Sequence, residues 1–235
     1  MPYKSLPLTE VNLRLALPGS APTESLVYLM DLQAGVGEDF QVLDVVRPET
    51  VPGFSEFEPA RLFLSKSSRE VIISCSPRLI KASWIASGTP TSATYPGFEI
   101  LFSAVMKFLR ARQELVVTEA HHACNIEYIN QFDLRTLSVP LHELLKIPNI
   151  EGVSWEEVQE YNVAWRKDGI DLRKVLARIG DPGLVFLSNV VGRLNSDGLP
   201  LEESLHLIHK TAIDHFEASI TAKGGKIFER HVDNA

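Results

Sequence analysis

Apolar and polar residues alternate along much of the chain, which is the pattern of strands with one buried face. Near the N-terminus Val11, Leu13 and Leu15 alternate with polar or small residues until Pro18-Gly19 ends the run. Shorter strands are predicted at residues 41–46, 61–64, 71–75 and 79–85. Strands therefore occur in neighbouring runs rather than each being followed by a helix.

Two segments repeat their apolar residues every three or four positions, as an amphipathic helix does. One follows Tyr95-Pro96-Gly97, and the other runs from about Pro200 to Thr221. The buried stripe of the first is predicted to hold Phe98, Leu101, Phe102, Val105, Phe108 and Leu109. That of the second is predicted to hold Leu201, Leu205, Ile208, Ala212, Phe216 and Ile220. We expect both stripes in the core.

Capping and stop signals predict two more helices and the end of the last one. Ser20 or Thr23 can cap a helix that Gly35 ends, and a short helix is predicted over residues 138–146. Gly224-Gly225 are expected to end the last helix. The polar tail from there, residues 224–235, is expected to be frayed.

One long strand is predicted over residues 116–132. In it Cys124, Ile126, Tyr128, Asn130 and Phe132 share one face, because side chains alternate along a strand. Asn125, Glu127, Ile129 and Gln131 share the other face. The second row is polar, so it faces either water or a cavity.

Residues 154–179 fit either strands or helices. A capping box at Ser154 and helical spacing up to Ile179 favour helices. The turn signals Lys167-Asp168-Gly169 and Asp181-Pro182-Gly183 favour a meander of antiparallel strands. We predict strands near residues 158–166, 170–179 and 184–195.

These elements predict an α+β fold: a mainly antiparallel sheet of about seven to nine strands with three or four amphipathic helices. The 235 residues are enough to bury a core without a metal or a disulfide. We predict a single domain over residues 1–235. A boundary near residues 148–152 is the alternative.

The net charge of −7 argues against binding along a phosphate backbone, which uses clustered cations on one face. The exception is a basic run that aspartates interrupt, which we interpret as a solvated, mixed-charge surface. Its five cations are Arg166, Lys167, Arg173, Lys174 and Arg178. A nucleic-acid partner is therefore not expected.

A cytoplasmic location is expected, because the first residues lack the apolar core of a signal peptide. The longest apolar stretch, residues 98–109, is too short for a membrane helix, so no membrane association is predicted. Cys75 and Cys124, the two cysteines, lie in apolar strands and are expected as buried thiols rather than a bridge.

The common catalytic and nucleotide motifs are missing. The sequence contains neither the P-loop pattern nor the GxSxG nucleophile elbow. Burial makes a thiol a poor nucleophile, so neither cysteine is a candidate for catalysis. No cofactor and no catalytic residue is predicted.

One metal site is a candidate. Glu202, His206 and His209 lie on one side of the last helix at spacings i, i+4 and i+7. The competing interpretation is that His209 is a hydrogen-bonded histidine at the edge of the core while Glu202 and His206 face water. A ligand or interface site is a second candidate, with Asn125, Tyr128 and Asn130 of the long strand.

Several short segments together resemble an uncharacterised, sporadically distributed family of prokaryotic proteins. Its members open with a proline before an alternating strand, as Pro7 precedes Val11 to Leu15 here. They carry a mid-chain Tyr-Ile-Asn strand, matched by Tyr128-Ile129-Asn130. They end on a helix like that of His209, Phe216, Ile220 and Thr221. One departure is Glu127, where the family often has arginine.

The resemblance implies an α+β fold with antiparallel strands and a setting in mobile-element or defence-type systems. It implies no activity and no catalytic residue. The leading hypothesis is a non-enzymatic interaction or accessory protein with a protein partner, or with a second copy of itself in a homodimer. The alternative is a small-ligand-binding or metal-dependent hydrolytic domain.

Overall fold

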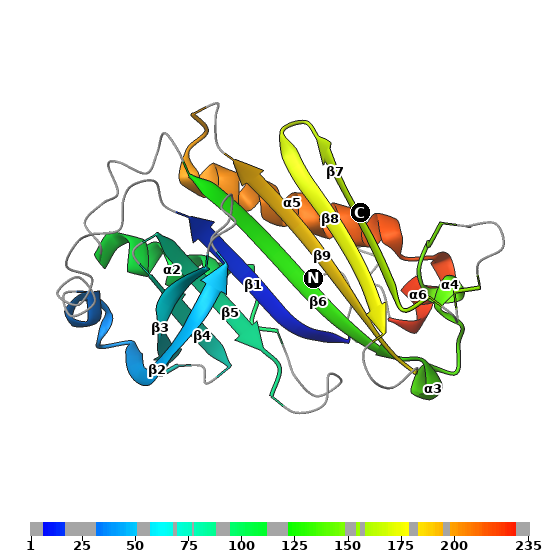
Figure 1. Ribbon diagram of the computed structural model, residues 1–235, viewed down its shortest axis with the longest axis horizontal. Helices are drawn as coiled ribbons and strands as arrows, with labels where there is room; N and C mark the ends of the chain where they lie inside the picture. Colours follow the sequence, from blue (N-terminus) through cyan, green and yellow to red (C-terminus); the bar gives the residue numbers. More distant parts are fainter. Residues whose placement is uncertain are drawn as a thin grey trace.

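The computed structural model of the protein describes residues 7–16, 32–50, 57–67, 70–76, 78–87, 95–111, 122–148, 154–155, 158–178, 183–194 and 198–228. Its main feature is one antiparallel sheet of nine strands in the order β2-β3-β4-β5-β1-β6-β9-β8-β7 (Figure 1). The strands are β1 Leu8–Ala16, β2 Phe40–Thr50, β3 Phe57–Ser65, β4 Val71–Cys75, β5 Leu79–Ile85, β6 Ala123–Asp133, β7 Glu160–Lys167, β8 Ile170–Arg178 and β9 Leu184–Leu194. The predicted α+β class is confirmed.

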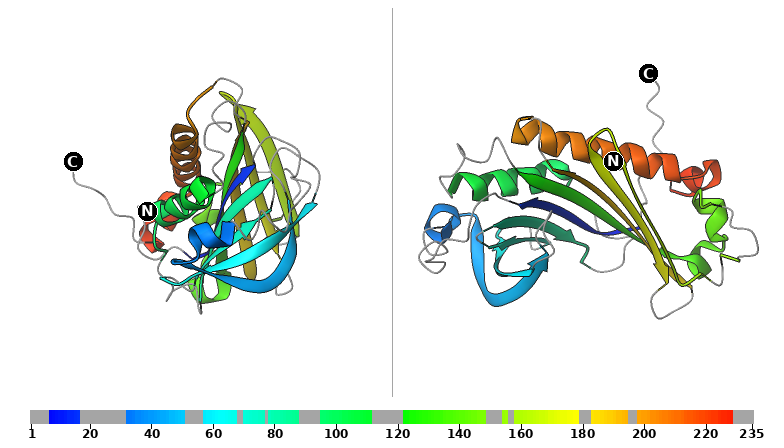
Figure 2. Two further views of the ribbon diagram at one scale, coloured as in Figure 1. Left: turned by 90° about the vertical axis from the view of Figure 1, so that its left-hand side faces the viewer. Right: turned by 45° about the horizontal axis from the view of Figure 1, so that its top comes forward.

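Two long helices cover one face of this sheet (Figure 2). α2, Phe98–Ala111, packs on β5, β1 and β4, and α5, Leu201–Ser219, packs on β9 and β6. The predicted stripes lie in this layer, with Leu101, Leu205 and Ile208 fully buried. Burying such side chains contributes about 1.5–3 kcal/mol each. The core therefore lies between the sheet and its two helices.

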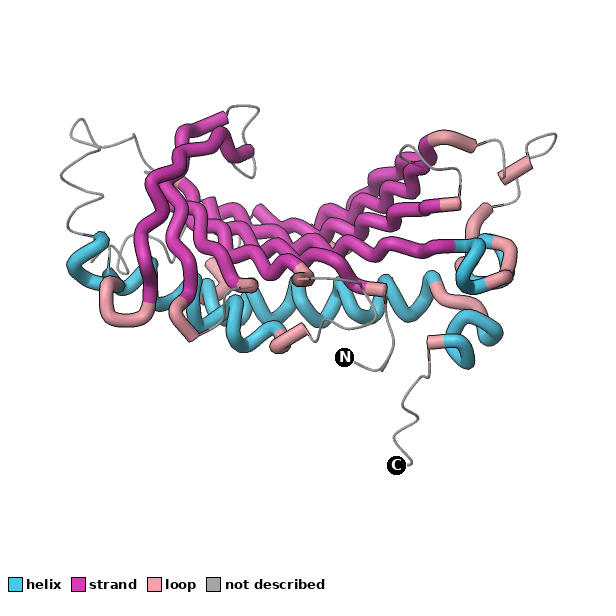
Figure 3. The backbone as a smooth tube through the Cα atoms, turned by 90° about the horizontal axis from the view of Figure 1, so that it is seen from below, coloured by secondary structure: helices cyan, strands magenta, loops and turns pink. Residues whose placement is uncertain are grey.

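The sheet is strongly curved, and both of its ends bend away from the helices (Figure 3). We call the face opposite α2 and α5 the open face. The β2–β3 end bends most, and the β2–β3 register shifts between Leu43 and Val46. A bulge of this kind bends a strand and increases its twist.

Strand β2 is longer than the predicted residues 41–46, and β3 is longer than 61–64. The predicted strands are shorter because proline lacks the backbone N–H that a strand donates to its neighbour, and it therefore normally interrupts a strand. Pro48 and Pro59 are partners in the β2–β3 register. Both prolines are tolerated because β2 is an edge strand and β4 pairs with β3 only from Arg61 to Leu64.

The meander predicted for residues 158–195 is confirmed as β7, β8 and β9. Asp168 and Gly169 both have positive φ at the β7–β8 turn, as a tight hairpin requires. β9 then pairs with β6. Strands from both sides of the alternative boundary at 148–152 thus belong to one sheet.

The predicted helix at 138–146 is instead two short helices, α3 Leu134–Leu137 and α4 Leu141–Leu144. Asp133 caps α3, and Pro140 separates the two because proline cannot continue a helix. The predicted helix between Ser20 and Gly35 lies mostly outside the described residues, of which 32–36 are helical.

The chain does not become irregular at Gly224. Residues Ala222–Ile227 form α6, which Thr221 caps, and Phe228 is buried. The expected frayed tail is therefore corrected for residues 224–228, and 229–235 lie outside the described residues. No helix in the described part of the chain is long and apolar enough to span a bilayer.

Candidate functional site

The strand register places two rows of side chains directly beside one another on the open face, because opposite residues of antiparallel strands share a face. From β5 to β7 the first row is Lys81, Arg14, Asn125, Gly192, Asp171 and Arg166. The second row is Ser83, Asn12, Glu127, Val190, Arg173 and Ala164. The open face is therefore mainly polar and charged across its centre.

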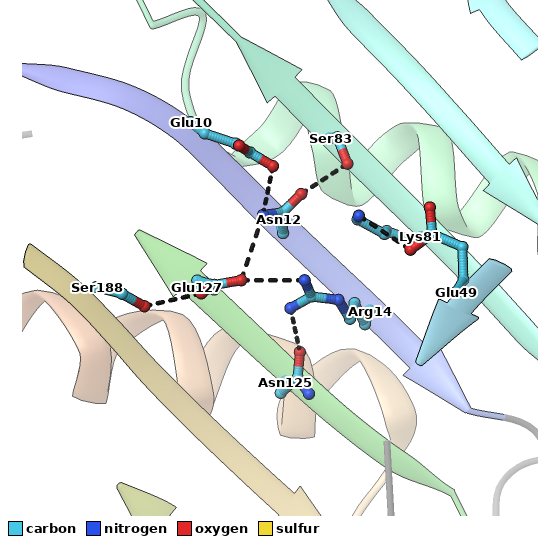
Figure 4. A network of polar contacts seen from close by, with 9 residues as sticks. All are labelled: Glu10, Asn12, Arg14, Glu49, Lys81, Ser83, Asn125, Glu127 and Ser188. Atoms are coloured by element: carbon cyan, nitrogen blue, oxygen red, sulfur yellow. Dashed lines mark hydrogen bonds and ion pairs between the residues drawn. The ribbon is translucent and has the colours of Figure 1, made fainter. Parts of the chain in front are cut away.

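Glu127 is the centre of a polar network on this face (Figure 4). Its carboxylate accepts hydrogen bonds from Arg14 Nη2 at 3.0 Å, Asn12 Nδ2 at 3.3 Å and Ser188 Oγ at 2.7 Å. The donors come from both neighbouring strands, β1 and β9. Three donors occupy most of the acceptor capacity of the carboxylate, so Glu127 holds other residues in place rather than being free to bind.

The charge state of Glu127 reflects this environment. Burial alone disfavours the ionised form, but the Arg14 guanidinium and the hydrogen bonds from Ser188, Arg14 and Asn12 outweigh it and lower the pKa of Glu127. Glu127 is therefore a carboxylate at neutral pH, and its charge is balanced by Arg14.

Arg14 is fixed in position by the same network. Its Nη1 atom donates to Oδ1 of Asn125 at 3.3 Å, in addition to the ion pair with Glu127. Asn12 is held in turn by Ser83, whose hydroxyl donates to it at 2.7 Å. A guanidinium has five N–H donors, so Arg14 keeps donors beyond those used by these two contacts.

A second ion pair fixes the curved end of the sheet. Glu49 of β2 accepts from Lys81 of β5 and from Ser74 of β4, each at 3.0 Å, and all three side chains are buried. β2 and β5 are separated by two strands in the sheet order. Contact between them therefore requires the β2–β3 end to arch over the open face.

Next to Asn125, a groove with a cavity volume of about 470 Å³ runs over β6, β9, β8 and β7. Gly192 lies in its floor, and a Cβ atom there would come 3.4 Å from Cβ of Asn125. The absence of a side chain at Gly192 thus contributes to the depth of the groove. Its lining includes Asn125, Ala164, Asp171, Arg173, Val190 and Gly192.

One cation in the groove lining, Arg173, is bonded to a neutral side chain rather than to a carboxylate. Arg166 donates twice to Asp171, at 2.6 and 2.8 Å, so these charges neutralise each other. Arg173 instead donates from Nε to the neutral amide of Asn162 at 3.1 Å. Arg173 is exposed, and its remaining donors are available to a ligand.

The predicted metal residues are not assembled into a site. Glu202 and His206 are exposed, and Nδ1 of His209 is 2.8 Å from the Tyr128 hydroxyl. The ring of His209 stacks on Phe98 with centroids 4.0 Å apart. The described residues contain no group of three or more potential metal ligands. This geometry agrees with the core-edge interpretation of His209.

The three predicted ligand residues of β6 lie on different faces. Asn125 lies on the open face and lines the groove, whereas Tyr128 and Asn130 lie under α5 and are buried. Burial raises the pKa of Tyr128 well above its usual value, so it is a neutral phenol, and its hydroxyl shares a hydrogen bond with His209. Asn125 therefore cannot line one cavity together with Tyr128 and Asn130.

The cysteines and the basic run also separate on folding. Both cysteines are buried and free, and burial raises the pKa of Cys124 to about 12. Arg166 and Arg173 lie on the open face, while Lys174 lies on the helix side. The predicted mixed-charge surface is thus divided by strand alternation between two sides of the sheet.

The sequence pattern indicates Asn125 and the polar row containing Glu127, but not their partners. Arg14 and Ser188 are distant in sequence and come next to Glu127 only through the register of β1 and β9. The groove over β6, β9, β8 and β7 has no sequence signal of its own, apart from a glycine, Gly192, inside a strand. The protein-family models and the curated proteins compared with this sequence gave no match.

Proposed function

We propose that the protein is a non-enzymatic binding protein that holds an acidic segment of a partner protein in the groove of its open face. The observation that supports this most strongly is the guanidinium of Arg173 in the groove wall, which donates to a neutral amide rather than to a carboxylate. Arg14, whose charge Glu127 balances, lies next to the groove through its contact with Asn125 and keeps unused N–H donors. Guanidinium groups pair with carboxylates through charge-assisted hydrogen bonds, which are stronger than neutral ones.

The shape of the groove favours an extended peptide. It crosses four neighbouring strands and is open along its length, and its floor has small or apolar side chains at Ala164, Val190 and Gly192. Such a floor suits the apolar side chains of a peptide whose acidic residues reach the arginines. A long polyanion such as nucleic acid is disfavoured by the net charge of −7.

The fixed geometry of Arg14 supports recognition rather than catalysis. Glu127 and Asn125 hold the guanidinium before a partner arrives, so less conformational freedom is lost on binding. The resemblance to a sporadically distributed prokaryotic family supports a partner that belongs to a mobile-element or defence-type system.

Peptide selection followed by titration tests this function. Peptides are selected from a random phage-displayed library, synthesised with a fluorescent label and titrated by fluorescence anisotropy. We expect the selected peptides to contain aspartate or glutamate. Arg173→Ala should weaken their binding at least tenfold, because it removes an exposed cation without disturbing the core.

Arg110→Ala is the matched control, because Arg110 is exposed on α2, on the other side of the sheet. It should bind as tightly as the unmodified protein. Selected peptides without acidic residues, or equal binding by Arg173→Ala, would contradict the proposal. Tighter binding of a single-stranded oligonucleotide than of any selected peptide would assign the groove to nucleic acid instead.

A further inference from the structure

A second pocket lies on the helix side of the sheet, at the C-terminal end of α5. Its cavity volume of about 250 Å³ is below the ~300–1,000 Å³ that is usual for drug-sized ligands. Apolar and aromatic side chains form most of its wall, together with the amines of Lys146 and Lys174 and the hydroxyls of Tyr161 and Ser219. The residues that matter here are Ile147, Tyr161, Val163, Trp165, Lys174 and Ser219.

Lys174 is a half-buried cation without a counter-ion among the described residues. Its Nζ atom donates to Oγ of Ser219, which itself donates to the His215 carbonyl at 2.7 Å. An ammonium group has three donors, and this contact uses one. Burial lowers the pKa of Lys174, as expected when a cation leaves water without a carboxylate beside it.

Two neighbouring polar groups lack hydrogen bonds within the described structure. Asn189 lies directly opposite Lys174 in the β8–β9 register and is fully buried, and neither its Oδ1 nor its Nδ2 has a partner. The Nδ1 atom of His215 is also buried without a partner. More than about nine in ten buried polar groups are satisfied in native proteins, so this concentration is unusual.

The C-terminal end of α5 explains in part why the cation of Lys174 lies here. A cation near the last turn of α5 interacts favourably with the helix dipole. However, the Ser219 carbonyl already accepts the backbone N–H of Lys146 at 2.7 Å. The dipole therefore explains why a cation is tolerated at this place, but not why an open apolar pocket surrounds it.

We propose that this pocket binds a small organic acid, whose carboxylate pairs with Lys174 and whose apolar body contacts Val163 and Trp165. An amine at the end of an apolar cavity fits a molecule with one anionic end and one apolar end. The limited volume sets the size to that of a single ring or a short branched chain. This site lies on the other side of the sheet from the groove of the open face. Trp165 borders both, but neither proposal depends on the other.

Isothermal titration calorimetry with benzoate and 3-methylbutanoate tests the proposal, with benzamide and 3-methylbutanamide as neutral analogues of the same shape. We expect at least one acid to bind saturably with a Kd of about 1 mM or lower. Its amide should bind at least tenfold more weakly, because the charge pairing with Lys174 is lost.

Lys174→Met removes the charge but keeps an unbranched side chain, and it should weaken binding of the acid at least tenfold. Lys210→Met is the matched control, since Lys210 is exposed on the same helix that borders the pocket, and it should bind normally. Val163→Trp fills the pocket from an edge strand and should abolish binding even if Lys174→Met folds poorly. Lack of saturable binding by both acids, equal binding of acid and amide, or undiminished binding by Val163→Trp would overturn the proposal.

Discussion

The guanidinium of Arg14 and the carboxylate of Glu127 face each other across β1 and β6, with Nη2 and Oε2 3.0 Å apart on the open face of the sheet. Each side chain keeps less than a fifth of its surface exposed, at 18% and 17%. This pair joins the two central strands and fixes one of the two arginines beside the groove. Its contribution to stability and its contribution to binding can be separated by mutation.

Removing only one partner of this pair should be costly. Glu127→Leu removes the counter-ion of Arg14 and one acceptor each of Asn12 and Ser188, and we expect a loss of about 2–3 kcal/mol in the free energy of unfolding. The double variant Arg14→Met/Glu127→Leu should recover most of that loss, because no unpaired charge remains. Urea unfolding followed by circular dichroism measures both, and strictly additive effects of the two substitutions would refute the coupling.

Acid should destabilise the protein through His209. Burial, with a smaller contribution from His206, lowers the pKa of His209 to about 4, whereas in the unfolded chain it is about 6.5. Between these values the unfolded state binds more protons, so stability is complete above about pH 6.5 and falls as the pH approaches 4.

The variant His209→Gln should lose less stability than the unmodified protein when the pH is lowered from 7 to 4. Part of the dependence should remain, because burial also lowers the pKa of His215 to about 4. His142→Gln, at an exposed position of α4, should retain the full dependence. Identical pH profiles for His209→Gln and the unmodified protein would show that His209 is not the group responsible.

Two adjacent glycines of α6 should respond differently to alanine. A Cβ atom at Gly224 would lie 2.4 Å from the Leu144 carbonyl oxygen, whereas at Gly225 it would meet nothing within 4 Å. Gly224→Ala must therefore move α6 away from α4 and should cost about 1–3 kcal/mol.

Gly225→Ala should instead stabilise the protein by up to about 1 kcal/mol, because alanine favours the helix over glycine. Melting temperatures of the two variants, measured side by side, test this packing. A Gly224→Ala variant as stable as Gly225→Ala would mean that α6 does not pack on α4 in this way.

Most of the fold could be predicted from the sequence because its elements carry strong local periodicity. The stripe of α2 from Phe98 to Leu109 and the alternation of β1 lie where the pattern indicated. β8 was ambiguous, because Leu172, Val175 and Leu176 fit a helix by spacing, and the β7–β8 hairpin with Asp168-Gly169 decided the outcome.

The candidate sites were much less predictable, because they depend on pairing between distant strands. Arg14 and Glu127 are 113 residues apart, and Lys174 and Ser219 are 45 residues apart. A one-residue change of register would move every side chain of a strand to the other face. Sequence alone therefore identified the polar row on β6 but could not show that Arg14 is paired with it.

Filling the groove without disturbing the core is the most direct test of the proposed binding function. Gly192→Val places a side chain in the groove floor. A Cβ atom there is in van der Waals contact with Asn125 Cβ and the Cys124 carbonyl oxygen and clashes with neither. Valine also suits a strand better than glycine, so stability should be maintained or increased. Titrated by fluorescence anisotropy with an acidic peptide selected for the unmodified protein, Gly192→Val should bind at least tenfold more weakly while its urea midpoint is unchanged or higher. Equal affinity in a stably folded Gly192→Val variant would contradict the account.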